Sequence, residues 1–507
     1  MKPRKTKRIA VARLPSETLP SETPPRETRP VPPDPPRGGI AFYAIASVLL
    51  LVPCFWQSRI QAGDLSSHIY NTWLTREVVA RQIPGVAIVR QSTNVLFDWL
   101  LAVLSAKWGM DIAQRVAVSL AVLVFFWGAY AWLTAVTGRQ PRDLAPALAV
   151  LAFGWVFHAG FFNFYLSLGL CFWAMAVAWP GGRRRLAAAA PLVIVAWIAH
   201  NLPVAWMAAI ASYTALAPRL TSRQRSAALG ALITALLAIH AIVRNSSFAT
   251  WDSRQLLLTT GTDQAWIFDD KYLSVVAGLS IVFAALFLTA LWKTGWRAVT
   301  ASIPFHLWVL TAAGVAIVPT SIDGYGLYVA YIADRMSLPA AVCLCAVLAS
   351  VRMNVIERYG LVAVMLAFFG FLYRDGRILN EFEDQLQAVV AQVPERSRVI
   401  SAIGDTDLHL NAMVHMIDRA CVGRCYSYAN YEASTGNFRL RAVSENPVVA
   451  ATYAQSWLLQ NGRYKVQPRD VPLYEVNVNQ SNQIIVRSLQ AGERTNLRNL
   501  KMLPDLF

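Results

Sequence analysis

Charged residues are scarce in this chain. Only 15% of its 507 residues are charged and 55% are hydrophobic, which excludes an ordinary soluble enzyme. Seventeen Trp and 17 Tyr accompany long apolar runs, a pattern typical of membrane proteins with aromatic side chains at the membrane interfaces. Cysteine is also rare, and four of the six cysteines lie in apolar runs, where a small buried hydrophobic side chain is their usual role.

The first 38 residues lack the apolar residues that a folded core needs. A basic start is followed by a stretch rich in Pro, Thr and Glu, a composition typical of disordered segments. No small-residue cleavage site follows the basic start, so we do not predict a secretory signal. We expect residues 1–38 to be a disordered, basic, Pro-rich cytoplasmic tail.

Apolar runs of helical length recur from residue 39 onward. We predict a polytopic α-helical membrane protein with about eleven spans, some of them shorter than the roughly 20 residues that a helix needs to cross the hydrocarbon core. The predicted spans are 39–56, 110–137, 144–157, 162–179, 187–199, 202–217, 227–244, 272–292, 298–319, 336–350 and 359–373.

Basic residues are concentrated in one set of loops. The tail carries a net charge of +5, and alternate short loops, such as the one with Arg183, Arg184 and Arg185, together carry +10. The loops on the other side carry no net charge, and residues 374–507 carry +1. Cytoplasmic loops are enriched in Lys and Arg, so we expect the N-terminus inside and the C-terminal part outside. Because +15 of the net charge of +16 lies in the tail and these loops, no nucleic-acid partner is predicted.

Two external segments are predicted to fold outside the transmembrane domain of residues 39–373. In the first external loop, 57–109, apolar residues recur at helical spacing, which predicts two amphipathic helices on the membrane surface. The last segment, 374–507, is predicted to be a small external α/β domain. Its expected elements are a helix ending at Pro394, a strand at 398–403, a helix at 447–460 and a strand pair at 473–478 and 483–489.

A polar stretch after the first span holds the strongest candidate site. Asp64 and His68 are four residues apart, so they share one face of a helix. The predicted cytoplasmic loops contain no histidine, paired carboxylates or Gly-rich loop, which places any chemistry on the outer face. Asp64 could deprotonate an acceptor hydroxyl, and His68 could orient Asp64 or bridge to a substrate or metal. The alternative is that Asp64 caps the helix and His68 faces lipid headgroups.

This arrangement resembles the class C (GT-C) fold of membrane glycosyltransferases, which include protein O-mannosyltransferases and lipid A aminoarabinose transferases. The resemblance rests on the spans, the external α/β domain, and Gly63 and Asp64 at the start of the first external loop. It implies a catalytic Asp64, a polyprenyl-phosphate-linked sugar donor and an active site on the non-cytoplasmic face. The family often has a second acid beside the catalytic Asp, where this chain has Leu65. His68 is an alternative for part of that role, and a divalent cation stays an open candidate cofactor.

A lipid-linked donor needs a cation for its phosphate and an apolar groove for its tail. Arg335 follows Asp334 where an external loop enters a span, just after an aromatic stretch that ends in Tyr331. Arginine suits a phosphate through its bidentate fork. The alternative is an interfacial Asp–Arg anchor with aromatic neighbours.

Other polar residues lie at predicted external turns. Asn163, His200 and Asn201 could line a sugar pocket, or they could cap the helices that begin there. Asp269 and Asp270 stand where a span begins. They could contact an acceptor or a metal ion, or they could form a solvated edge.

Two cysteines, Cys421 and Cys425, follow His409 and His415 in the predicted external domain. Thiolates and imidazoles are zinc ligands, although this spacing matches no standard zinc pattern. Oxidation outside the cytoplasm favours a disulfide. A disulfide, free thiols and a zinc site all stay open.

We therefore predict a membrane glycosyltransferase that transfers a sugar from a polyprenyl-phosphate donor to a glycan, lipid or protein acceptor of the cell envelope, with Asp64 as the general base. One alternative is a transporter or flippase of a lipid-linked substrate, although the internal repeats and midplane charges typical of transporters are not evident. Another is a non-catalytic membrane scaffold whose external domain binds a partner. The expected location is a bacterial inner membrane, with the chain crossing it several times.

Overall fold

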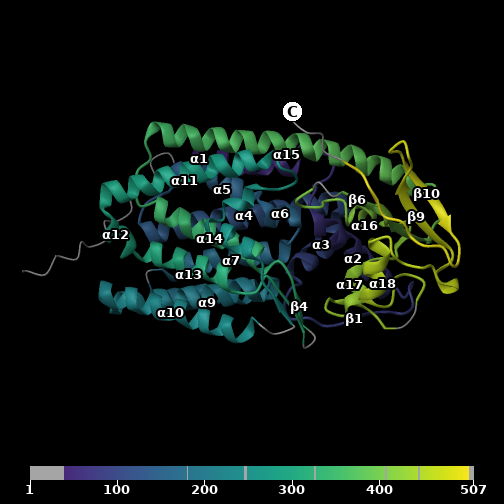
Figure 1. Cartoon of the computed structure of the whole chain (residues 1–507), viewed down its shortest axis with the longest axis horizontal. Helices are drawn as coiled ribbons and strands as arrows, with labels where there is room; N and C mark the ends of the chain where they lie inside the picture. Colours follow the sequence, from purple (N-terminus) through teal and green to yellow (C-terminus); the bar gives the residue numbers. More distant parts are fainter. Residues whose placement is uncertain are drawn as a thin grey trace, which may run out of the picture.

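The computed structural model describes residues 39–179, 181–244, 248–324, 327–405, 408–443 and 446–501. The predicted tail over 1–38 lies outside these residues. A bundle of long helices forms one end of the molecule, and most strands gather at the other end (Figure 1). The helices of the bundle are α1 (Gly39–Leu51), α4 (Met110–Thr137), α5 (Ala145–Ala152), α6 (Trp155–Ala159), α7 (Phe162–Ala178), α8 (Arg183–Ala199), α9 (Asn201–Leu216), α10 (Ser222–Val243), α11 (Tyr272–Thr294), α12 (Trp296–Thr300), α13 (Ile303–Ile317), α14 (Ile332–Leu348) and α15 (Val355–Val390).

Four helices of the described chain, α4, α10, α11 and α15, are long and apolar enough to cross a membrane. Helix α10 has no buried residue and exposes Ile239 and Ile242, as expected of a helix surrounded by lipid. Shorter apolar helices include α7 and α13. Each of the eleven predicted spans contains helix, but the number that crosses the membrane stays a prediction.

Helices α4 and α7 approach closely where two glycines meet. A Cβ atom at Gly128 would lie 2.4 Å from the carbonyl oxygen of Gly169, and one at Gly169 would lie 2.7 Å from the Cα of Phe125. No side chain fits between the two backbones. Small residues at helix crossings are typical of membrane proteins, in which close packing replaces the hydrophobic driving force between helices.

Helix α2 (Gly63–Val79) differs from the predicted amphipathic surface helix. Leu65, Tyr70, Leu74 and most of their neighbours are buried. The reason is that the C-terminal part of the chain covers the helix, and the backbone N–H of Ser427 donates a 3.0 Å hydrogen bond to the Tyr70 hydroxyl. The prediction of an amphipathic helix with an exposed polar face is therefore wrong for α2.

The second predicted helix of the first external loop is α3 (Leu96–Trp108), and it keeps an exposed apolar edge with Trp99 and Val103. Between α2 and α3, strand β1 (Val86–Ile88) pairs with β8 (Leu440–Ala442). The first external loop is thus joined to the C-terminal part by a small two-stranded sheet.

Helix α15 runs without a break from the bundle into the C-terminal part (Figure 1). It has 36 residues, so its length is about 54 Å. The predicted domain boundary at residue 373 falls inside this helix, and no linker separates the two parts. The second half of α15 corresponds to the helix predicted to end at Pro394.

A mixed sheet in the order β10–β9–β5–β7 follows α15. Strands β9 and β10 are antiparallel with Leu473 opposite Leu489, whereas β5 runs parallel to β9 and β7. Helix α18 begins later than the predicted residue 447. The elements of the C-terminal part are β5 (Arg398–Ser401), β6 (Ile403–Gly404), α16 (Met416–Cys421), β7 (Tyr426–Ser427), α17 (Tyr431–Thr435), α18 (Tyr453–Gln460), β9 (Leu473–Val478), β10 (Ile484–Leu489) and β11 (Arg498–Asn499).

Three short strands form a separate antiparallel sheet in the order β2–β3–β4. They connect two predicted external loops of the bundle. Their bounds are β2 (Ala249–Thr250), β3 (Ser321–Gly324) and β4 (Leu327–Val329).

A buried ion pair joins the C-terminal part to the bundle. The guanidinium of Arg419 in α16 makes two 2.7 Å contacts with the carboxylate of Glu383 in α15, and the two side chains are 6% and 0% exposed. Gln61 donates a 2.8 Å hydrogen bond to Glu383, and the carbonyl of Ile60 accepts one of 3.1 Å from Arg419. The pair therefore holds α15, α16 and the residues that lead into α2.

We predict that Arg419→Met lowers the free energy of unfolding by about 3 kcal/mol, because the buried Glu383 would lose its two short contacts with a cation and keep only Arg59 at 3.7 Å. Equilibrium unfolding of the purified protein in detergent micelles measures the loss. Glu381→Gln, which breaks the exposed Arg377–Glu381 pair on the same helix, should leave stability nearly unchanged. Equal stability of Arg419→Met and Glu381→Gln would contradict this prediction.

Candidate functional site

The start of helix α2 is packed tightly against the turn after α6. A Cβ atom at Gly160, whose φ is +84°, would lie 2.5 Å from the backbone nitrogen of Asp64. Only glycine allows this contact, which fixes the first turn of α2 on the bundle. The N-cap is Ala62, and no side chain caps the helix. Asp64 is therefore not the helix cap; it lies in the first turn, where the helix dipole favours a negative charge.

Asp64 and His68 share one partly accessible face of α2. Their side chains are 23% and 12% exposed, whereas residues 65–67 and 69–72 are buried. The four-residue spacing thus places both side chains toward the same region of the structure.

His68 is paired with a carboxylate of α3 and makes no recorded hydrogen bond to Asp64. Its Nδ1 lies 2.9 Å from Asp98 Oδ1. Burial by itself lowers the pKa of His68, but the attraction and hydrogen bond of Asp98, together with Glu432 and Asp64, raise the pKa to about 9. The imidazole is therefore a cation at neutral pH and donates to Asp98, which excludes it as a neutral base.

Asn163 acts on this pair through Asp98. Its Nδ2 donates a 2.9 Å hydrogen bond to Asp98 Oδ2, and its Oδ1 accepts one of 2.8 Å from the backbone of Phe97. Although burial raises the pKa of Asp98, His68 and Asn163 offset this effect and hold the pKa below its ordinary value. The buried Asn163 fixes the Asp98 carboxylate, which in turn keeps His68 protonated. Asn163 does not itself face the accessible side of α2.

The C-terminal part supplies a second histidine beside Asp64. His415 Nε2 lies 3.5 Å from Asp64 Oδ1, and His415 Nδ1 lies 3.0 Å from Asp418 Oδ2. The ring of Tyr431 packs 5.1 Å from the imidazole. Burial lowers the pKa of His415, but Asp418 and then Asp64 and Glu432 more than offset it, so the pKa is raised. A cationic His415 therefore lies beside the Asp64 carboxylate.

Glu432 of α17 is a buried carboxyl group in the same region. Its Oε1 accepts a 3.2 Å hydrogen bond from the Ser67 hydroxyl. Burial raises its pKa to about 7, and Asp98 and Asp64 add to the effect although His68 opposes it. A cavity of about 20 Å³ lies beside Glu432, His68 and Asp98, which is room for one water molecule.

Arg335 is a cation whose buried Nε makes no hydrogen bond in the described structure. The guanidinium lies 3.7 Å from the centre of the Phe161 ring. Among the acidic groups around it, Asp64 attracts it most strongly. The rings of Trp155, Phe161 and Tyr331 lie within 5.7–6.0 Å of one another, so an aromatic surface surrounds the cation.

These side chains converge from α2, α14, α17 and the residue before α16, and we name them the Asp64 cluster. Its members are Asp64, His68, Arg335, His415, Tyr431 and Glu432.

His200 lies near Arg335 but has a structural role. Burial and the charge of Arg335 lower its pKa to about 3, and its neutral Nδ1 accepts a 3.1 Å hydrogen bond from the backbone of Leu202 as the cap of α9. Asn201 is exposed. Asp334 accepts a hydrogen bond of 3.4 Å from a threonine hydroxyl, and no ion pair joins it to the adjacent arginine in the described structure.

Asp269 and Asp270 are not brought into the Asp64 cluster. Lys271 Nζ lies 2.5 Å from Asp269 and 2.8 Å from the buried Asp375 of α15. Asp270 is exposed. Asp269 therefore belongs to an ion pair network that fixes the start of α11.

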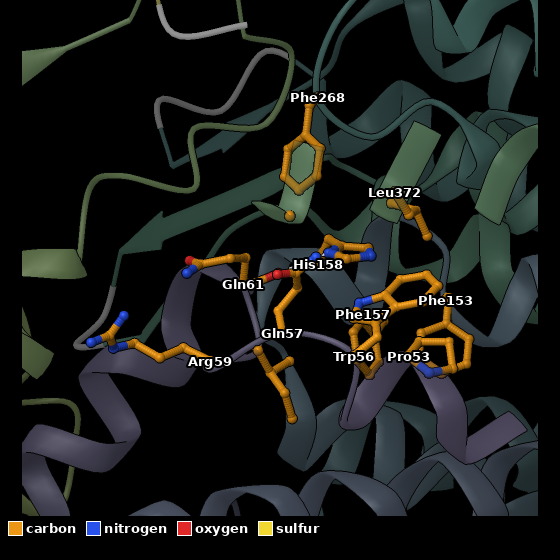
Figure 2. Close-up of a pocket in the computed structure, with 12 residues that line it drawn as sticks. Pro53, Trp56, Gln57, Arg59, Gln61, Phe153, Phe157, His158, Phe268 and Leu372 are labelled. Atoms are coloured by element: carbon orange, nitrogen blue, oxygen red, sulfur yellow. Dashed lines mark hydrogen bonds between the residues drawn. The ribbon is translucent and has the colours of Figure 1, made fainter. Parts of the chain in front are cut away.

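A second small cavity lies beside the segment that leads into α2, and it has a volume of about 30 Å³. Aromatic side chains, including Trp56, Phe157 and Phe268, line it together with His158 (Figure 2). His158 Nδ1 lies 2.9 Å from the backbone carbonyl of Gln61, and its other ring nitrogen is buried without a partner in the described part of the chain. The cavity is large enough for a water molecule but not for a sugar.

Cys421 and Cys425 form a disulfide, so neither offers a thiolate to zinc. His409 stacks on Trp266 with a ring separation of 3.9 Å, whereas His415 belongs to the Asp64 cluster. Within the described ranges, no group of three or more His, Cys, Asp or Glu side chains is arranged to hold a metal ion.

Several residues of this region were not predicted as its members. His415 attracted attention only as a zinc candidate, and Asp98, Asp418 and Glu432 had no assigned role. Asp98 carries a sequence signal, because it is the one carboxylate in the mostly apolar helix α3. The other three are placed by long-range packing, for which the local sequence has no signal.

We predict that the stability gained from the His68–Asp98 pair disappears at high pH. The pKa of His68 is raised from 6.5 to about 9, so the gain is complete below pH 6.5 and is lost as the pH rises through 9. The difference in melting temperature between wild type and His68→Gln should therefore shrink from pH 6 to pH 10. His409→Gln is the control, because burial lowers the pKa of His409. A constant difference for His68→Gln would refute the assignment.

Comparison with known proteins gives no relative: the chain matches no family model, no curated protein and no solved structure. The resemblance to class C glycosyltransferases therefore stays a prediction from the sequence, and the function is argued from the Asp64 cluster itself.

Proposed function

We propose that this chain is a membrane glycosyltransferase that transfers a sugar from a polyprenyl-phosphate donor to a hydroxyl acceptor on the non-cytoplasmic face. The observation that carries the proposal is the pairing of an accessible carboxylate, Asp64, with an arginine on an aromatic surface, Arg335. A base and a phosphate-binding cation in one place are what this reaction needs.

Asp64 acts as the general base. It accepts the proton of the acceptor hydroxyl while the acceptor oxygen bonds to the anomeric carbon and the bond from that carbon to the phosphate oxygen breaks. His415, whose Nε2 lies 3.5 Å from Asp64 Oδ1 and whose pKa is raised, holds the carboxylate in place. Glu432, with a pKa of about 7, is suited to exchange a proton with the cluster at neutral pH.

Arg335 stabilises the negative charge that develops on the leaving phosphate. Its planar guanidinium lies on Phe161 and can offer two parallel donors to a phosphate. The surrounding rings of Trp155 and Tyr331 form an apolar surface for the first isoprene units of the donor. Donor phosphate and donor lipid are thus recognised side by side.

The proposed topology has about eleven spans and the N-terminus inside, and the positions of the basic loops support its orientation. In Figure 1, α12 and the start of α15 lie at the end of the bundle opposite to α2 and α17. The basic loops around Arg297 and Arg352 belong to that opposite end. The Asp64 cluster and the basic loops would then face opposite sides of a bacterial inner membrane.

We predict that Asp64→Asn lowers sugar transfer at least about 100-fold, because the amide cannot accept the proton of the acceptor. The assay measures undecaprenyl phosphate released from an undecaprenyl-phosphate-linked hexose by reconstituted protein with an envelope extract. Asp111→Asn is the matched control: Asp111 occupies the same position in the first turn of α4 but is exposed. Transfer that survives in folded Asp64→Asn would refute the role of Asp64.

We predict that Arg335→Gln lowers the same transfer rate about 100-fold or more, as expected when a donor to the transition-state charge is removed. Arg335→Lys should recover part of the rate, because it keeps the charge and loses the bidentate fork. Arg142→Gln is the control, since Arg142 also lies on a phenylalanine ring, 5.2 Å from the centre of Phe42. Equal effects of Arg335→Gln and Arg142→Gln would contradict the prediction.

A further inference from the structure

The longest stretch of the chain without an acidic residue runs from 144 to 251, and it contains seven arginines. Three of them, Arg219, Arg223 and Arg225, lie within seven residues where α9 ends and α10 begins. We name residues 217–225 the α9–α10 turn. Its charge of +3 has no neighbouring acid in the sequence, and none of its residues is a member of the Asp64 cluster.

The guanidinium groups of the α9–α10 turn form no ion pair within the described part of the chain. Arg219 and Arg223 are exposed, and Arg219 Nη1 donates a 3.3 Å hydrogen bond to the backbone carbonyl of Ala215. Arg225 is half-buried, and its buried Nε has no hydrogen-bond partner among the described residues. Three positive charges are thus close in the sequence, and no carboxylate of the described chain balances them.

Arginines of two other basic loops are engaged inside the protein. Arg139 donates hydrogen bonds to the backbone carbonyls of Ala349 and Val351. Arg358 pairs with Asp143 at 3.2 Å. These two side chains hold helix ends together, whereas the arginines of the α9–α10 turn keep donors that a ligand can use.

Arg225 lies where α9, α10 and α13 meet. The hydroxyl of Tyr213 is hydrogen-bonded to Nδ1 of His306, and the other ring nitrogen of His306 lies 2.7 Å from the carbonyl of Thr300. Tyr213 and His306 are both buried, and the charge of Arg225 acts on both. Neither side chain carries a negative charge, so this junction places the arginine without balancing it.

Helix α10 continues from the turn as an apolar and exposed surface. It is long and apolar enough to cross a membrane, and it has no buried residue. Leu232, Leu237 and Ile239 are 44–58% exposed, and the helix lies at the lower edge of the bundle in Figure 1. A cationic turn is therefore followed directly by a surface that suits acyl chains, which is the order of headgroup and chains in a phospholipid.

We propose that the α9–α10 turn binds the headgroup of an anionic phospholipid, whose acyl chains lie along α10. Guanidinium groups bind a phosphate through parallel hydrogen bonds, and basic clusters beside a membrane-crossing helix attract anionic lipids. A zwitterionic lipid is disfavoured, because its own ammonium group is repelled by the arginines. This inference rests on the membrane location and the proposed orientation, and it is independent of the proposed glycosyl transfer.

Native mass spectrometry of the full-length protein in detergent micelles tests the proposal, with phosphatidylglycerol and phosphatidylcholine as probes. Wild type and Asp64→Asn should both bind phosphatidylglycerol at least about tenfold more tightly than phosphatidylcholine. Combining Arg219→Gln, Arg223→Gln and Arg225→Gln should remove this preference. The double variant Arg219→Gln with Arg223→Gln leaves the half-buried Arg225 in place and should lose part of the preference, so the test holds even if the triple variant does not fold.

The matched control combines Arg81→Gln, Arg90→Gln and Arg494→Gln, which removes the same charge from three exposed arginines of the proposed outer side. It should bind both lipids like wild type. The proposal is overturned if wild type shows no preference for phosphatidylglycerol, or if the control loses as much of that preference as the triple variant. A photoreactive phosphatidylglycerol should label residues 217–244, and labelling confined to other residues would overturn the location. Displacement of the lipid by an equal concentration of glycerol 3-phosphate would overturn the lipid assignment.

Discussion

A carboxylate removed from water needs a matching charge, and the pairing of Glu383 with Arg419 meets this need at the junction of the molecule. The pair is almost completely buried, and Gln61 and the Ile60 carbonyl share its hydrogen bonds. Such a pair is costly to form and costly to break, so its main effect is to select one arrangement of the groups around it. Here it fixes α16 against α15, and with them the residues that precede Asp64.

Charged side chains are also paired in the Asp64 cluster, but they are less buried and their charges are less completely balanced. His68 is matched by Asp98, and His415 by Asp418. Asp64 attracts Arg335 more strongly than the other acidic groups do, and no direct salt bridge joins the two in the described structure. Glu432, held between acids and a cation, titrates near neutral pH. Groups whose charges are left partly uncompensated, with shifted pKa values, are typical of functional sites.

Much of the local structure follows from the sequence, because helix and strand patterns repeat over short distances. Each predicted span contains helix, and strands β5, β9 and β10 lie where short apolar runs between turn residues predict them. The spacing of Asp64 and His68 correctly places them on one face. The sequence pattern fails for α2, because the segment that covers it lies more than 350 residues away. The same distance hid His415 and Glu432, whereas the pairing of His68 with Asp98 depends on how α2 and α3 pack together.

The Asp64 cluster combines residues from distant parts of the chain, so its assembly depends on the order of synthesis. Glu432 leaves the ribosome 365 residues after Ser67, its hydrogen-bond partner in α2. Before residues 415–432 are made, α2 has no cover for Tyr70 and no histidine beside Asp64. The Asp64 cluster is therefore complete only when most of the chain has been synthesised, and a chain that ended before His415 would lack three of its six members, namely His415, Tyr431 and Glu432.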